Sequence, residues 1–334
     1  AQENPVVFKG ATIYPITSDP IERGILVIEN GLISAIGAES DVSIPADATT
    51  HDVSGKILMP GLVDTHSHVG GVSGGDRSSA THPEVRVLDS INPLSDTFMR
   101  ARAGGITTIN IMPGSGHLMS GQTVYVKNKP LNNIEEMLVC NDPLKDICGG
   151  MKMANGTNSI KEAPFPGTRG KSAAIIRQLY VKAQEYKKKI DNAMGDPEKL
   201  PERDLQMEAL VEVLEGKRIV QHHTHRSDDI LTVLRLAEEF GFKVVLHRVS
   251  EGQYVAEEIA KAGQELYDRL AKFQSHLARV GNRLHQATES YNNAVGSFTT
   301  RLEPGAKRLS ELHSTGGKEL PVTEPVDIEP RVLE

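Results

Sequence analysis

Hydrophobic positions divide the chain into three stretches of different periodicity. From residue 5 to about 58, short apolar runs alternate with Gly, Pro and Asp, and Asn30-Gly31 separates two of these runs. Asn-Gly between apolar runs is a strong hairpin signal. We therefore expect a small β-domain over residues 1–58, with no chemistry of its own.

The second stretch, residues 59–263, alternates strand-like apolar runs with helical segments. Strands are predicted at 57–59, 62–64, 106–112, 218–221 and 243–246, and helices at 171–194, 203–215 and 228–240. Such alternation predicts parallel βαβ units and an α/β fold. In folds of this kind, ligand sites lie at the C-terminal ends of the strands.

The third stretch, residues 264–304, carries a heptad pattern. Its apolar positions are separated alternately by four and three residues: Leu266, Leu270, Phe273, Leu277, Val280, Leu284, Ala287, Tyr291, Ala294 and Phe298. This spacing predicts a long coiled-coil-like helix that offers residues 266–298 for self-association and ends at Pro304. Residues 305–334 are rich in Pro and acidic side chains, and we expect them to be disordered.

Composition and charge narrow the class of protein. The 334 residues include 38% hydrophobic and 24% charged side chains, as in a typical soluble globular chain. No apolar run approaches the ~20 residues of a membrane span. The net charge of −7 argues against nucleic-acid binding. Cys140 and Cys148 are too few for a disulfide scaffold, and the sequence does not decide whether they pair.

The sequence begins at Ala1 rather than at Met. If Ala1 follows a cleaved export signal, we expect a periplasmic or secreted protein. If it does not, we expect a cytoplasmic one, and the residues leave both possibilities open.

Histidines end three of the predicted strands. His66 and His68 follow an apolar run, and as alternate residues of one strand they present two imidazoles on the same face, which is half of a metal site. Residues 221–226 (Gln-His-His-Thr-His-Arg) follow a second strand, and His247 ends a third. A single strand-end histidine is most simply structural. Three of them predict a shared metal ion, because the C-terminal ends of these strands converge.

Lys152 lies in a strand-like run between Met151 and Met153. Burying a charged lysine there would be costly. Carbamylation by CO2 would turn the side chain into an anionic bridge between two metal ions. The alternative is a lysine whose amine extends to solvent.

These motifs together resemble the metal-dependent amidohydrolases of the imidazolonepropionase-like branch, over about residues 5–263. Four segments carry the resemblance in the expected order: Pro60 to His68, 103–108, 113–115 and 223–226. The resemblance implies a (β/α)8 TIM-type barrel preceded by a small N-terminal β-sandwich. It also implies one or two divalent ions, with zinc expected, and a small amide or dipeptide-like substrate whose C–N bond is hydrolysed by a metal-activated water.

The same resemblance implies which residues act. The metal ligands would be His66 and His68 from strand 1, carboxylated Lys152 from strand 4, His223 (or His225) from strand 5, and His247 from strand 6. Two further residues are candidates for binding substrate. His117 is either a substrate contact or a loop histidine without a partner. Arg226 is either a clamp for a substrate carboxylate or part of a salt bridge within the barrel.

The barrel pattern stops at about Gly263. About 200 residues precede this point from Ile57 onward, whereas a complete barrel takes ~250, so only strands 1–6 are expected. The resemblance implies a proton-accepting aspartate at the end of strand 8. That residue has no counterpart here, so the catalytic residue stays unassigned and activity is in doubt.

Residues 264–315 resemble the C-terminal helical part of the DNA recombination protein RmuC family. The chain therefore resembles a chimera of a truncated hydrolase barrel and a helical segment. The first hypothesis is a metal-dependent hydrolase of C–N bonds in a cyclic amide or small peptide-like substrate. The alternatives are a catalytically dead fusion that acts as an assembly module, and a DNA-processing accessory protein, which the acidic composition disfavours.

Overall fold

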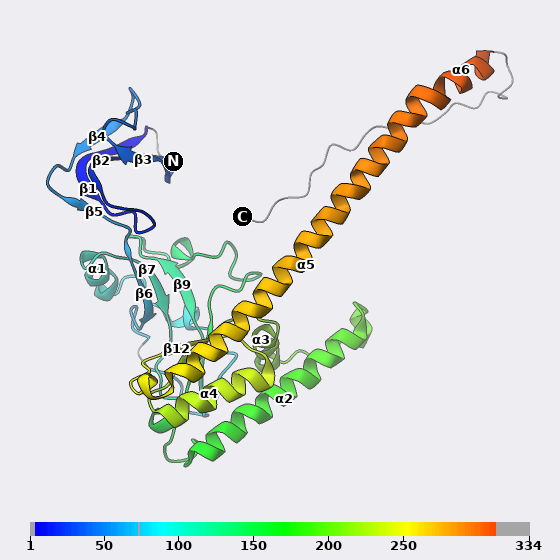
Figure 1. Ribbon diagram of the computed structural model, residues 1–334. Coiled ribbons are helices and arrows are strands. Elements are labelled where there is room, and N and C mark those ends of the chain that lie inside the picture. The colour runs from blue at the N-terminus through cyan, green and yellow to red at the C-terminus, as the bar shows by residue number, and fades with distance from the viewer. Residues whose placement is uncertain (1–3, 73, 312–334) are drawn as a thin grey trace. The chain divides into compact units, whose positions relative to one another are not determined.

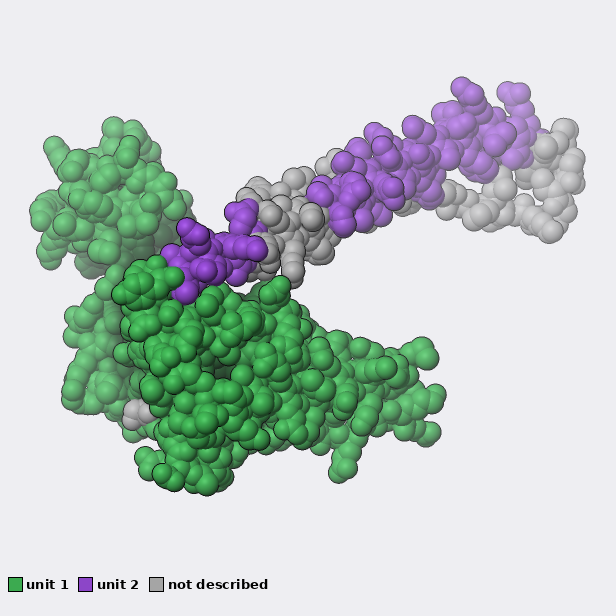
Figure 2. Space-filling model, turned by 60° about the horizontal axis from the view of Figure 1, so that its bottom comes forward, with its two compact units in different colours: residues 1–254 green, residues 255–334 purple. Residues whose placement is uncertain are grey.

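The computed structural model describes residues 4–72 and 74–311. The chain divides into two compact units, residues 1–254 and residues 255–334, which Figure 2 shows in different colours. The first unit contains the strands β1 to β12, and the second is helical where it is described (Figure 1).

The N-terminal strands form a single five-stranded sheet. They are β1 (Val6–Ile13), β2 (Ile21–Glu29), β3 (Leu32–Ala38), β4 (Thr49–Asp52) and β5 (Ile57–Leu58). The order is β3-β2-β1-β4, and β5 also pairs with β1. The predicted hairpin is confirmed: Asn30 and Gly31 both have positive φ, as a tight turn between β2 and β3 requires. A second layer is not seen within residues 4–58, so the sandwich stays a prediction.

The central strands lie in two separate sheets. One contains β6 (Leu62–Ser67), β7 (Ile106–Ile111) and β9 (Val124–Lys127); the other contains β12 (Val244–His247), β11 (Val220–His223), β10 (Met151–Ala154) and β8 (Met119–Gln122), each in that order. β6 pairs with β7 in parallel, and so do β10, β11 and β12 with one another. β8 pairs antiparallel with β10, and β9 pairs antiparallel with β7. The mixed α/β fold is confirmed, whereas a six-stranded parallel barrel stays a prediction.

Helices pack against both central sheets: the first of them packs with β7 and β9, and the other three enclose the larger core with the second sheet. They are α1 (Asp96–Ala103), α2 (Arg169–Ala193), α3 (Leu205–Leu214) and α4 (Ser227–Phe240). Short 3₁₀ helices occur at Val87–Ser90, Glu135–Met137, Gly156–Asn158, Pro197–Lys199 and Gly252–Val255. Tyr180 of α2, Leu210 of α3 and Phe240 of α4 pack with Val220 of β11 in one core cluster. Side-chain caps fix three of these helix starts, because Ser95, Thr168 and Asp204 accept hydrogen bonds from backbone amides of the first turns.

Cys140 and Cys148 form a disulfide, which answers the question that the sequence left open. The bridge closes the segment between β9 and β10. Tyr125 of β9 is bonded to both flanks of this segment: its N–H donates to the carbonyl of Cys148 at 2.9 Å, and its carbonyl accepts from Val139 at 3.0 Å. The disulfide therefore anchors the entry into β10, the strand that carries Lys152.

The second unit begins with α5 (Ala256–Ser297), continues through a π-helical turn at Phe298–Leu302 and ends in α6 (Glu303–Glu311). Two boundary predictions are wrong. The helix begins at residue 256 rather than 264, and it does not end at Pro304. Pro304 is the second residue of α6, a position where a helix needs no backbone N–H donor, so residues 305–311 are helical. The remaining predicted tail, 312–334, lies outside the described residues.

Among the helices of the described chain, none is long and apolar enough to span a membrane.

Candidate metal centre

The predicted ligands lie at neighbouring strand ends. His223 ends β11 and pairs in register with His247, which ends β12. Lys152 lies on the other side of β11, opposite Gln221. Since β10, β11 and β12 are parallel, their functional side chains reach the same edge of the sheet, as predicted.

His66 connects this edge to the other sheet. Its ring centroid lies 4.9 Å from that of His247, 6.1 Å from that of His223 and 5.4 Å from that of His68. The ring of His225 lies 4.5 Å from that of His223. Five imidazoles from three strands and their following loops are therefore gathered at one place, although β6 is not hydrogen-bonded to β11 or β12.

Several of these rings are bonded to protein groups instead of being free to bind an ion. His68 Nδ1 lies 2.8 Å from the Met112 carbonyl oxygen, and His223 Nε2 lies 2.8 Å from His225 Nε2. His247 Nε2 donates to Gln221 Oε1 at 2.7 Å. Within residues 4–72 and 74–311, no group of three or more His, Cys, Asp or Glu side chains is placed so that it could hold a metal ion as it stands.

Other polar atoms of the cluster are buried without a hydrogen-bond partner. They are both ring nitrogens of His66, Nδ1 of His223 and the amine of Lys152. Buried polar groups are normally satisfied, so each of these atoms calls for an explanation. Imidazole nitrogens suit zinc and related divalent ions, and such an ion would satisfy His66 and His223. The chemistry of the donors therefore fits a divalent cation. Side-chain rotations would have to complete the site.

The protonation states favour ligand binding. Burial and the nearby Lys152 charge lower the pKa of His66 and of His223 to about 3, and that of His247 to about 4. These imidazoles are neutral at pH 7, which is the state in which histidine binds a metal ion. Burial, with a contribution from Arg248, lowers the pKa of Lys152 to about 7. A substantial fraction of neutral amine, the form that reacts with CO2, is thus present near neutrality.

His117 lies in a different group of side chains. Its ring is 5.7 Å from that of His82 and 5.1 Å from that of Phe165, and both of its nitrogens are buried without a partner. The structure thus places His117 beside His82, with no ring contact to the gathered imidazoles.

Arg226 is held at the surface by a carboxylate. It donates to both oxygens of Asp228, at 2.9 and 2.7 Å, and half of its side chain is exposed. A salt bridge was the alternative to substrate binding in the sequence analysis. Its partner, Asp228, lies in the first turn of α4.

Arg248 is a residue that the sequence analysis missed. It follows His247 directly, and its positive charge is among the causes that lower the pKa of Lys152, His66, His223 and His247. In the sequence, the only feature that could have pointed to Arg248 was its position directly after a histidine that ends a strand.

The expected catalytic aspartate has no substitute in this cluster. β12 is the last strand of the described chain, and α5 begins at Ala256. Asp229 is buried but engaged in a bidentate ion pair with Arg169, at 2.9 and 3.2 Å. No described carboxylate can be assigned as the proton acceptor from its contacts.

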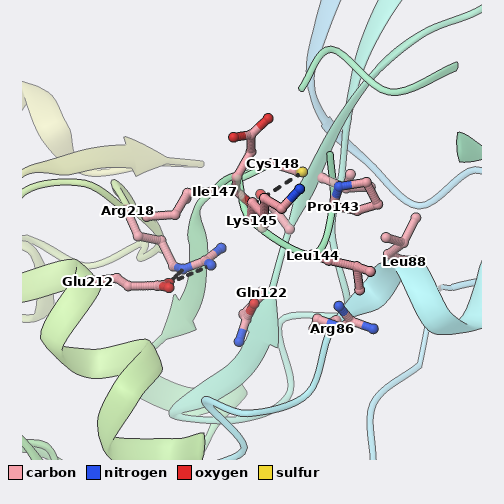
Figure 3. Close-up of a pocket in the computed structure, with 13 residues that line it drawn as sticks. Arg86, Leu88, Gln122, Pro143, Leu144, Lys145, Ile147, Cys148, Glu212 and Arg218 are labelled. Carbon is pink, nitrogen blue, oxygen red and sulfur yellow. Dashed lines mark hydrogen bonds and ion pairs between the residues drawn. The ribbon is translucent and has the colours of Figure 1, made fainter. Parts of the chain in front are cut away.

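A cavity of about 180 Å³ lies elsewhere in the first unit (Figure 3). It is lined by residues that precede β10 and β11, including Cys148 and Arg218, so it borders the strand ends opposite to the histidines. Arg218 is bonded to Glu212 at 2.6 Å within it. The cavity is therefore separate from the candidate metal centre.

Comparison with known structures decides the family. A crystal structure of an amidohydrolase from Thermotoga maritima MSB8 matches with a TM-score of 0.70 and 35% sequence identity. The match covers 77% of this chain and 67% of that one. The chain belongs to the amidohydrolase family. Imidazolonepropionase from Paracoccus denitrificans is also similar to this amidohydrolase, with 36% identity over 125 residues that cover 29% of the chain and 30% of the enzyme.

The C-terminal part of this amidohydrolase matches a second family. Residues 245–319 match the model of the RmuC family. A DNA recombination protein RmuC homologue from Zymomonas mobilis is 36% identical over 78 residues, which are 23% of this chain and 17% of the homologue. The predicted RmuC resemblance is confirmed, but the match begins at Val245 rather than at residue 264. It therefore includes His247 and Arg248.

The chain spans about a third or less of the curated relatives that it matches first: 30%, 30% and 22% of their lengths.

Proposed function

We propose that this amidohydrolase is a metal-dependent hydrolase of C–N bonds in a cyclic amide or small peptide-like substrate. One observation carries the proposal: the rings of His223 on β11 and His247 on β12 lie beside that of His66, whose two buried nitrogens have no protein partner. Family membership supports it independently.

The residues that would hold the ion are His66, His68, His223 and His247, with carbamylated Lys152 as an oxygen donor. One or two divalent ions would bind, and zinc is the ion that we propose. When bound, the ion polarises the amide carbonyl and lowers the pKa of a water molecule toward neutrality. His225, in the loop after β11, is the alternative ligand to His223, because its ring already contacts that of His223.

The protein itself would supply position and a low-dielectric surrounding. Lys152 is fully buried, and His223 and His247 are nearly so. Because no described carboxylate can be assigned as proton acceptor from its contacts, we propose that the proton of the attacking water passes to solvent. A positioned general base typically contributes a factor of about 10²–10⁴, so we expect slow turnover.

Metal analysis is the first test of this proposal. After incubation with zinc and bicarbonate followed by gel filtration, the protein should retain one to two equivalents of zinc. The variant His66→Asn should retain less than half of this amount. His51→Asn is the matched control, because His51 lies on β4 and stacks on Phe8.

An amide panel is the second test. Zinc-dependent hydrolysis of any cyclic amide or dipeptide, absent from His66→Asn, would support catalysis. Stoichiometric zinc without hydrolysis of any substrate would support the metal site and contradict the proposed hydrolase activity. No retained zinc would contradict the proposal.

A further inference from the structure

Arg248 has a constrained backbone at the end of β12. Its φ of 59° lies in the left-handed region, which is costly for a residue with a side chain. Ser250 stabilises this turn by donating from its N–H at 2.7 Å and from its hydroxyl at 3.2 Å to the Arg248 carbonyl. The Ser250 hydroxyl also lies 2.9 Å from His225 Nδ1. The turn therefore fixes the origin of the Arg248 side chain relative to the histidines.

Two other arginines near the site are each paired with a carboxylate, whereas the Arg248 guanidinium is not paired with any described carboxylate. Arg169 is paired with Asp229, and Arg226 is paired with Asp228. Among the described residues, no side chain hydrogen-bonds or forms an ion pair with the Arg248 guanidinium, which is exposed. A delocalised cation with five donors is thus available to a ligand.

The acidic side chains that follow β11 and β12 are engaged with other groups: Asp228 with Arg226, and Asp229 with Arg169. Glu251, three residues further along, accepts hydrogen bonds from the N–H and hydroxyl of Ser227. A substrate anion could therefore bind the Arg248 guanidinium, which no carboxylate of the described chain neutralises.

We propose that Arg248 binds a carboxylate of the substrate, so that the preferred substrates are amides carrying a free carboxylate, such as N-acyl amino acids or dipeptides. The planar guanidinium fork matches a carboxylate with two parallel hydrogen bonds, which distinguishes it from a neutral amide. This assignment rests on the proposed function, because it places the substrate beside the same histidines.

Binding of two matched probes tests the assignment without turnover. N-acetylglycine and N-acetylglycinamide differ in a carboxylate against a carboxamide. By titration calorimetry, the full-length protein should bind N-acetylglycine at least tenfold more tightly. Arg248→Met should abolish this preference and leave the affinity for N-acetylglycinamide unchanged. Arg226→Met, in which an arginine already paired with Asp228 is removed, should keep the preference.

Three results would overturn the assignment: equal binding of both probes, no detectable binding of N-acetylglycine, or loss of the preference in Arg226→Met but not in Arg248→Met. Zinc content and thermal stability of each variant separate these results from misfolding. If the protein retains no zinc, the proposed function fails, while a carboxylate preference that depends on Arg248 would still be measurable in the metal-free protein.

Discussion

The ring of His66 lies 4.9 Å from the ring of His247, although His66 belongs to β6 in one sheet and His247 ends β12 in another. The parallel sheet β10-β11-β12 alone supplies His223 and His247. His66 is the residue through which the strand β6 joins them. A ligand bound to all three histidines would therefore tie the two sheets together and would stabilise the folded state.

The first prediction concerns this coupling. Zinc should raise the free energy of unfolding of the protein by about 2.7 kcal/mol when its concentration is a hundredfold above the dissociation constant. His66→Asn should lose most of this gain, because the ion would then contact one sheet only. Thermal denaturation with zinc and with EDTA measures the effect. The same zinc-induced rise in both proteins would show that the ion binds elsewhere.

The second prediction concerns Lys152 in the metal-free protein without bicarbonate. Burial lowers the pKa of its amine from the ordinary value of 10.5 to about 7. Between these values the unfolded chain binds a proton that the folded chain lacks, so stability rises with pH, by up to about 1.4 kcal/mol per unit. This contribution is complete above pH 10.5 and is lost as the pH falls toward 7.

Lys152→Met removes the titrating group. Urea denaturation at pH 7.5, 8.5 and 9.5 should give a flatter dependence for the variant than for the parent. The variant should also be more stable at pH 7.5, by about 1–3 kcal/mol, since an unpartnered buried amine is replaced by an apolar side chain. If the free energy of unfolding depends on pH in the same way in both proteins, the Lys152 amine is solvated in the folded state.

The sequence predicted the parts of this site that depend on strand periodicity. His223 and His247 could be found because an apolar run ends at each of them, and parallel strands bring such ends together. Arg248 could not be found, because its left-handed backbone and missing anion are properties of the folded turn. The sequence also did not predict β8, which lies in one sheet while β9, after Thr123, lies in the other. The reason is that Met119–Gln122 lacks the β-branched pattern of a strand.

The continuation of the helix past Pro304 was missed for a related reason. Proline blocks the interior of a helix but is tolerated near its start. The preceding π-helical turn at Phe298–Leu302 creates such a start within a continuous helical segment. A sequence pattern shows the proline but does not show the change in hydrogen-bonding register before it.

The third prediction concerns the disulfide between Cys140 and Cys148. Closing a loop of this length is worth about 2–3 kcal/mol by the entropy of the unfolded chain. Cys140→Ser with Cys148→Ser should lower the free energy of unfolding by about that amount, as measured by urea denaturation under non-reducing conditions. Addition of a reductant should destabilise the parent equally and leave the double variant unchanged. Equal free energies of unfolding for the parent and the double variant would contradict this prediction.

The same bridge bears on the compartment. Disulfides persist in oxidising environments and are rare in the cytosol. We therefore propose a periplasmic or secreted location. Mass spectrometry of alkylated protein from native cells checks it: two unmodified, bridged cysteines support the proposal, and two alkylated thiols contradict it.

The last prediction concerns self-association through α5. Val280 and Leu284 belong to the heptad pattern, and each leaves 54% of its surface exposed in the single chain. Apolar side chains repeated along one helix face are stabilised when a second helix covers them, and we propose that a second copy of this chain does so. Replacement of both by glutamate should weaken the dimer at least tenfold, because like charges would then meet across the seam, and sedimentation equilibrium measures this change. The matched control is Asn282→Glu with Gln286→Glu, which adds two charges at exposed positions outside the heptad seam and should leave the dimer intact. A parent protein that stays monomeric at tens of micromolar, or equal weakening in both variants, would show that this face of α5 has no such role.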